Sequence, residues 1–138
     1  EFNLYVDPWA AHVVLGAGIP QVMFGLDVTL QAQMSAAWLD ALHRRSATGA
    51  TLAAMMRSYG AADPCLHDPC VIAWLIEPTL FTGIDAHVSV VTEGAAAGQT
   101  LAAVKPRHLA GRAPNIHIMT GVDNPRLLAL LAERLAGY

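Results

Sequence analysis

Charged residues are scarce in this sequence, and no part of it is strongly basic. Only 14% of the 138 residues are Asp, Glu, Lys or Arg, whereas roughly 25% is usual for a soluble domain. Eight basic and 11 acidic residues give a formal net charge of −3, and the longest basic run is Arg44-Arg45. Proteins that bind nucleic acid or anionic membranes need clustered positive charge. The composition therefore speaks against both kinds of partner.

Long apolar runs and a secretion leader are also missing. No apolar run approaches the roughly 18 residues that cross a membrane, and no basic segment followed by an apolar one begins the chain. We therefore expect a cytoplasmic protein that does not enter a membrane. The length suits one domain with its own core, so we expect residues 1–138 to form a single domain. The low charge and the start at Glu1, without a methionine, indicate part of a larger domain.

Cysteine is rare, and several enzyme signatures do not occur. Cys65 and Cys70 have no second pair, so a zinc site is disfavoured, and two small buried side chains are favoured over a redox role. The sequence has no G-x-S-x-G, no H-E-x-x-H and no phosphate-binding glycine loop. Its aspartates are scattered, and a single one cannot provide the roughly six to eight oxygens of a calcium site.

Capping residues and apolar periodicity predict two helices in the first third of the chain. Asp7 is the expected cap of a helix over residues 8–16. An apolar residue at every fourth position from Leu30 to Leu42 predicts a second helix, over residues 27–45. The apolar face of the first helix is expected to hold Trp9, Val13 and Val14.

The rest of the chain is predicted to mix short helices with strands. Residues 84–90 alternate apolar and polar side chains, which is typical of a strand with one wetter face. A short helix is expected to begin at Thr51, and Asn124 is expected to cap a terminal helix with Leu127, Leu128, Leu131 and Leu135 on one face. We expect an α/β fold that contains part of an open mixed sheet flanked by helices. The other expected elements are strands at 21–26, 100–104 and 115–120, loops at 46–49 and 105–114, and a strand end or loop at 1–6.

The stretch Leu66-His67-Asp68-Pro69-Cys70 places a proton donor beside a carboxylate at the start of a predicted helix. Residues 69–76 carry no charge, so this helix is expected to be apolar all round and to lie inside a core. Pro69 suits the first helical position, and Asp68 is the expected N-cap. One oxygen of Asp68 would cap the helix while the other faces outward and could hold a hard cation. His67 could donate a proton to a bound group.

A plainer interpretation competes with this site. Asp-Pro and Asn-Pro begin ordinary helices, and this chain repeats the pattern at Asp7-Pro8 and Asn124-Pro125. From the pattern alone, a helix start beside an uninvolved histidine is favoured over a functional site.

Five short motifs follow one another from the first residue to about residue 100. They are Glu1-Phe2-Asn3-Leu4-Tyr5-Val6-Asp7-Pro8, Gly18-Ile19-Pro20, Leu26-Asp27-Val28-Thr29, Leu66-His67-Asp68-Pro69-Cys70 and Gly98-Gln99-Thr100. His-Asp-Pro alone would be a weak signal, but the ordered series is specific. The series resembles the C-terminal half of an inosine–uridine nucleoside hydrolase.

The resemblance implies a calcium-dependent N-ribohydrolase that cleaves ribonucleosides to ribose and free base. In that family a calcium-bound water, deprotonated by an aspartate, attacks the anomeric carbon. Asp68 matches a calcium ligand that also contacts a ribose hydroxyl, and His67 matches the histidine that assists departure of the base. Glu1 and Asn3 match the pair that hydrogen-bonds the ribose hydroxyls, a task that suits their acceptor and donor groups.

Four further positions also allow a plain structural interpretation, and one family feature is missing. Arg57 and Tyr59 match the segment that covers the base, but they equally suit a solvated and a packed residue. Asp27 and Thr29 are interpreted as residues that close a strand and cap the next helix. In the family, an N-terminal cluster Asp-x-Asp-x-Gly-x-Asp-Asp provides most of the calcium ligands and the catalytic base. This cluster does not occur in the sequence.

We therefore expect the chain to carry the ribose and leaving-group side of a nucleoside hydrolase site and to be inactive alone. The alternative is a non-catalytic α/β module that binds a partner. The low charge content also predicts an uncovered apolar face, and hence a homo-oligomer.

Overall fold

The computed structural model describes residues 2–136 of the chain. They form two compact units, each built from two separate segments. The first unit combines the N-terminal segment up to Gly25 with Gly83–Thr120, and the second combines Leu26–Thr82 with the C-terminal segment from Gly121. Within the described residues, no helix has both the length and the apolar character that crossing a membrane requires.

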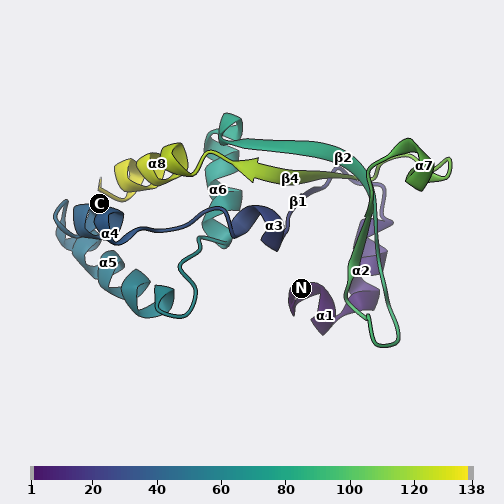
Figure 1. Cartoon of the computed structure of the whole chain (residues 1–138), viewed down its shortest axis with the longest axis horizontal. Coiled ribbons are helices and arrows are strands. Elements are labelled where there is room, and N and C mark those ends of the chain that lie inside the picture. Colours follow the sequence, from purple (N-terminus) through teal and green to yellow (C-terminus); the bar gives the residue numbers. More distant parts are fainter. Residues whose placement is uncertain (1, 137–138) are drawn as a thin grey trace. The chain divides into compact units, whose positions relative to one another are not determined.

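The four-stranded sheet is mixed, as the sequence predicts (Figure 1). Its strand order is β1-β4-β2-β3. β1 (Val22–Phe24) runs parallel to β4 (Ile116–Val122), whereas β2 (Phe81–Val90) and β3 (Thr100–Ala103) are antiparallel. All four predicted strands are confirmed, with ends that differ by a few residues.

Helix α2 (Pro8–Leu15) packs on this sheet in the first unit through a different face from the predicted one. The Ala10 N–H donates to Asp7 Oδ1 at 2.9 Å, which confirms the predicted cap. The helix is apolar nearly all round, so periodicity could not select the buried face. Ala11 and Leu15 contact the sheet core, while Trp9, Val13 and Val14 stay exposed. The sheet residues in this core are Ala86, Val88, Val90, Ile116 and Ile118.

Asn115 joins the end of α2 to the sheet. Its Nδ2 donates to the backbone oxygens of Leu15 and Val88, each at 3.0 Å, and its Oδ1 accepts from the Val88 N–H at 2.8 Å. Both ends of the amide are therefore engaged, and a single side chain fixes where α2 ends beside β2.

Two short helices occur where the sequence predicts a strand end or loop, namely α1 (Phe2–Val6) and α7 (Pro106–Leu109). The turn between β2 and β3 approaches α1 closely, because a Cβ atom on Gly98 would lie 2.5 Å from the Cα atom of Tyr5. Gly98 also has a φ of 86°, in the region that favours glycine. This contact comes from a distant part of the sequence, so the local pattern of residues 1–6 does not reveal the helix.

The second unit is largely helical. Its elements are α3 (Leu26–Thr29), α4 (Ala36–His43), α5 (Ala47–Gly60), α6 (Asp68–Ile76), the 3₁₀ turn η1 (Pro78–Leu80) and α8 (Asn124–Ala136).

Helices α4 and α5 begin at positions that differ from the predicted ones, because each begins after a serine cap. The predicted helix over 27–45 is divided into α3 and α4, because Ser35 Oγ accepts from the Trp38 N–H at 3.1 Å and starts a new helix. Ser46 Oγ accepts from the Gly49 N–H at 3.0 Å, so α5 begins before Thr51 and the predicted loop at 46–49 is wrong. A side-chain cap stabilises a helix start by about 1 kcal/mol, which outweighs a continuous apolar pattern.

Helix α8 packs against α4 and α5. Its predicted apolar face is confirmed, since Leu127 is fully buried and Leu128, Leu131 and Leu135 are partly buried. The indole N–H of Trp38 donates to the Leu128 backbone oxygen at 2.9 Å. The cap is Asp123 rather than Asn124, because Asp123 Oδ1 accepts from the Arg126 N–H at 3.2 Å.

Candidate functional site

Asp68 is the first residue of α6, and His67 occupies the N-cap position without a capping hydrogen bond from its side chain. The predicted N-cap role of Asp68 is therefore wrong, because Asp68 itself has helical geometry. Its carboxylate is exposed rather than partly desolvated, and it has no hydrogen-bond or ion-pair partner among residues 2–136. Both carboxylate oxygens of Asp68 are thus free to contact a cation or a hydroxyl group.

Helix α6 is not enclosed in a core, although its residues 69–76 are uncharged. Cys70 and Ala73 are buried, but one side of the helix faces solvent. The prediction of an all-round buried helix is wrong for this chain, because the described residues cover only one side of α6. The exposed apolar residues of α6 are Val71, Ile72, Leu75 and Ile76, and we call them the open face of α6.

His67 is held at both ring nitrogens within the second unit. Its Nδ1 lies 2.8 Å from Thr29 Oγ1, and its Nε2 lies 2.9 Å from Asp63 Oδ2. An ionised carboxylate can only accept a hydrogen bond, so the network assigns a hydrogen to Nε2, while a hydroxyl can donate to or accept from Nδ1. The His67 side chain is 23% exposed, so the ring is only partly accessible to solvent.

The hydrogen bond from His67 keeps Asp63 ionised. It is the largest cause of a pKa of Asp63 below the ordinary carboxyl value, and the backbone N–H of Cys65, 3.1 Å from Asp63 Oδ1, adds to the effect. A carboxyl whose pKa is lowered stays charged throughout the neutral range. Asp63 is therefore a permanent acceptor beside His67 at neutral pH.

Backbone pairing brings these distant residues together. Thr29 ends α3, and Asp63 lies in the loop that follows α5. The Leu66 N–H donates to the Ala32 oxygen at 2.8 Å, and the Met34 N–H donates to the Pro64 oxygen at 2.9 Å. These bonds fix the loop before α6 along the segment that follows α3.

Sequence reasoning missed Thr29 and Asp63 as neighbours of His67. Thr29 was interpreted as a residue that closes a strand and caps a helix, and Asp63 carried no motif. The only sequence feature that relates Asp63 to His67 is their spacing of four residues. That spacing indicates a contact in a helix but not in a loop. The contact arises from the pairing of two loops and has no periodic pattern.

Among the described residues, the other candidate site residues lie in both units. Asn3 lies on α1 in the first unit, where its side chain is exposed. Glu1 lies outside the described residues. Arg57 forms an ion pair with Asp40, and Tyr59 is exposed rather than packed.

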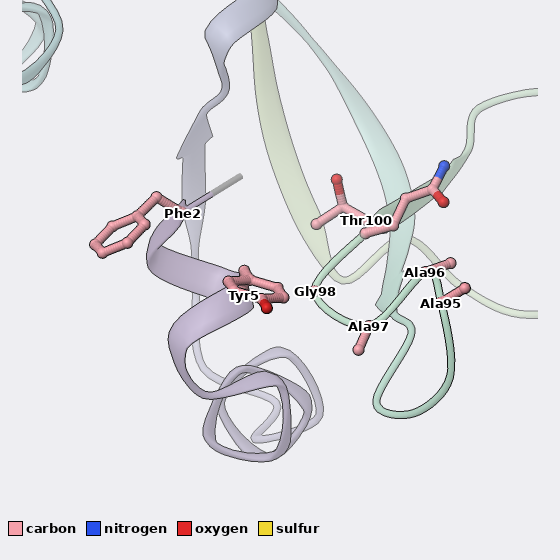
Figure 2. A pocket seen from close by; sticks show the side chains of 8 residues that line it. Phe2, Tyr5, Ala95, Ala96, Ala97, Gly98 and Thr100 are labelled. Carbon is pink, nitrogen blue, oxygen red and sulfur yellow. The ribbon is translucent and has the colours of Figure 1, made fainter.

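A hollow of about 610 Å³ lies in the first unit beside α1 (Figure 2). Figure 2 shows Tyr5 of α1 beside the turn at Gly98. Among the described residues 2–136, its lining includes no charged side chain and neither of the two residues at the start of α6. Residues 2–136 also contain no group of three or more His, Cys, Asp or Glu side chains that could surround a metal ion. The lining residues are Phe2, Tyr5, Ala95, Ala96, Ala97, Gly98, Gln99 and Thr100.

Comparison with solved structures places the fold among nucleoside hydrolases. The chain superposes on the plant nucleoside hydrolase PpNRh1 with a TM-score of 0.85 and 26% identity, over 99% of this chain and 47% of that one. It superposes on the purine-preferring ribonucleoside hydrolase from Gardnerella vaginalis with a TM-score of 0.78 and 30% identity, over 95% of this chain and 44% of that one.

Sequence comparison agrees. Residues 1–129 match the family model described as inosine-uridine preferring nucleoside hydrolase. The pyrimidine-specific ribonucleoside hydrolase RihA of Klebsiella pneumoniae is 41% identical over 148 aligned residues, and RihA of Citrobacter koseri is 42% identical over 151. Both alignments cover the whole chain but 47% of the relative, so the chain spans about half the length of these curated relatives. The chain belongs to the inosine-uridine preferring nucleoside hydrolase family.

The two thiols near this site are expected to be unreactive in the native chain. Both cysteines are free and buried, as the sequence predicts. Burial, with a smaller effect of Cys65, raises the pKa of Cys70 to about 11 from 9.0, so its thiolate fraction at pH 8 falls about a hundredfold. We expect iodoacetamide at pH 8 to label Cys70 at least that much more slowly in the native chain than in urea, as measured by mass spectrometry. Equal rates in the two states would contradict the buried position of Cys70.

Proposed function

We propose that this chain is the C-terminal half of a nucleoside hydrolase, which cleaves the N-glycosidic bond of ribonucleosides to ribose and free base. The observation that carries the proposal is the paired His67 and exposed Asp68 at the start of α6, in a chain that belongs to this family. Coverage of 47% of the RihA relatives supports the half-domain part of the proposal. The lack of an Asp-x-Asp-x-Gly-x-Asp-Asp cluster supports it as well.

In this proposal His67 is the proton donor to the departing base. The contact with Asp63 assigns a hydrogen to Nε2, and donation of that hydrogen from the protonated ring to the base leaves a neutral imidazole with its hydrogen on Nδ1. A nucleobase is a poor leaving group until one of its nitrogens is protonated, so a positioned histidine accelerates cleavage. Asp68 is the neighbouring acceptor for a ribose hydroxyl. Asn3 and Glu1 are proposed to bind the other hydroxyls of the ribose.

The residues present fit one part of a calcium site. Calcium prefers oxygen ligands and takes roughly six to eight of them. Asp68 offers an exposed carboxylate with which no other described residue forms a hydrogen bond or ion pair. Since residues 2–136 hold no cluster of acidic side chains around it, we propose that Asp68 supplies one ligand and that the N-terminal half supplies the others.

Ribonucleosides are the proposed substrate class, without a preferred base. The relatives differ in this respect, since RihA is named pyrimidine-specific and the Gardnerella vaginalis enzyme purine-preferring. Arg57 and Tyr59 stay candidates for base contact. The cytoplasmic location also stays a prediction.

The exposed apolar faces indicate where the other half would pack. The open face of α6 and the exposed side of α2 each present large apolar side chains to solvent. Burial of such surface contributes roughly 25 cal/mol per Å². We propose that the N-terminal half covers these faces in the complete domain, and that a second copy of the chain covers them when the chain is alone.

The first prediction tests the roles of His67 and Asp68 in the full-length hydrolase, meaning the polypeptide in which the N-terminal half precedes residue 1. Asp68→Asn should lower kcat by about two orders of magnitude, because the charge offered to a cation is lost. His67→Ala should lower kcat about a hundredfold for inosine and uridine, but much less for a nitrophenyl riboside, whose leaving group needs no proton.

Steady-state kinetics on the three substrates measure both effects. Asp85→Asn, which changes another exposed aspartate on strand β2 of the first unit, is the matched control and should keep wild-type kinetics. Equal losses on all three substrates for His67→Ala would remove the leaving-group role.

A second prediction concerns the isolated chain. It should form a dimer or larger species at tens of micromolar, and the species should persist at high salt because an apolar contact is not screened. Light scattering at two salt concentrations measures it. Replacing Ile72 and Leu75 by serine should shift the chain toward the monomer, whereas Met55→Ser, at an exposed residue of α5, should not. A monodisperse wild-type monomer would contradict the prediction.

A further inference from the structure

His67 has no free ring nitrogen in this structure. Thr29 occupies Nδ1 and Asp63 occupies Nε2, at 2.8 and 2.9 Å. A histidine held at one nitrogen can still rotate about its side-chain bonds. When both nitrogens form hydrogen bonds, the ring has a single orientation, so the two partners together fix the ring.

Thr29 is the buried partner. Its side chain is among the least accessible polar groups of the described residues, with 4% of the residue exposed. Its position at the end of α3 is held by the Ala32 N–H, which donates to the Thr29 oxygen at 3.1 Å. Because a hydroxyl can both donate and accept, this contact holds Nδ1 whether or not that nitrogen carries a hydrogen. The contact therefore orients the ring in either protonation state.

Asp63 is the accessible partner, and it is itself oriented. Its Oδ1 accepts from the Cys65 N–H at 3.1 Å, which leaves Oδ2 directed to His67. The Asp63 side chain is 38% exposed. The Nε2 edge of His67 therefore points to the more open side of the cluster, and the Nδ1 edge points to the buried side.

We propose that Thr29 and Asp63 are positioning residues of His67: Thr29 fixes the ring on its buried side, and Asp63 orients the Nε2 edge toward the open side, where the departing base displaces Asp63 as the acceptor of the Nε2 hydrogen. This inference rests on the proposed function of His67. In this inference neither Thr29 nor Asp63 reacts with the substrate. A misplacement of about 1 Å at such a group can cost on the order of a hundredfold in rate.

The kinetic test uses two pairs of substitutions in the full-length hydrolase. Thr29→Val and Asp63→Ala remove the contacts, and both should lower kcat for inosine and uridine about 10- to 100-fold, with KM changed less than about twofold and a much smaller loss on the nitrophenyl riboside. Thr29→Ser keeps the hydroxyl and Asp63→Asn keeps an acceptor oxygen. Both should recover kcat to within a few-fold of wild type.

Two matched controls remove similar groups elsewhere. Asp85→Ala breaks another His–Asp contact, in which His117 Nδ1 lies 2.7 Å from Asp85 Oδ1. Thr51→Val removes a hydroxyl that donates to the Ala47 oxygen of its own helix. Both controls should leave the kinetics unchanged.

A structural measurement on the 138-residue chain itself separates positioning from catalysis. In proton–nitrogen correlation spectra of the histidine rings, Thr29→Val should shift the Nδ1 signal of His67 and Asp63→Ala the Nε2 signal, while the His117 signals stay in place. Unchanged His67 signals in both variants would overturn the inference.

The outcomes distinguish this inference from the proposed function. If His67→Ala has no leaving-group-dependent effect, the proposed function fails. If His67→Ala shows that effect but Asp63→Ala and Thr29→Val keep wild-type kcat on nucleosides, only the positioning inference fails. If Thr29→Val prevents folding because Thr29 is buried, the comparison of Asp63→Ala with Asp63→Asn tests the positioning inference by itself.

Discussion

The hydrogen bond between Thr29 and His67 joins segments that are 38 residues apart in the sequence, and the arrangement at the start of α6 depends on it. The loop that carries Asp63 lies along the segment after α3, so Thr29, Asp63 and His67 meet at one point. A buried hydroxyl without a partner would cost about 1–3 kcal/mol. The same contact therefore satisfies Thr29, orients His67 and sets the approach of the chain to Asp68.

Local signals were sufficient for much of the fold. Asp7 before Pro8 defines a cap by itself, and the alternation in residues 84–90 defines a strand by itself, so both appear in the structure as predicted. Local sequence patterns predicted the wrong structure where a capping hydrogen bond or a contact with a distant part of the chain determined the backbone conformation. Ser35 divides an apolar pattern that looks continuous, and the approach of Gly98 to Tyr5 accompanies a helix in residues that read as a loop.

The candidate site shows the same division. The motif around His67 and Asp68 is contiguous, so the sequence could identify both residues and relate them to a family. Thr29 and Asp63 are related to His67 only through loop pairing, which has no periodicity and no fixed spacing. The environment of Asp68 differs from the predicted one, because the absence of charge in residues 69–76 does not establish that the helix is enclosed. In the chain as it stands α6 buries Cys70 and Ala73 and leaves its open face uncovered.

The uncovered face and the partial length have one common explanation in the half-domain proposal. In that proposal, a chain that spans about half of its curated relatives keeps the proposed proton donor and one proposed acceptor, and the other half covers its apolar faces. The most direct measurement mixes this chain with a separately expressed N-terminal half of the Klebsiella pneumoniae relative and follows inosine and uridine hydrolysis. We predict no turnover from either half alone, turnover from the mixture, and loss of that turnover with His67→Ala in this chain. Turnover by the 138-residue chain alone, or turnover by the mixture that is unaffected by His67→Ala, would contradict the half-domain proposal.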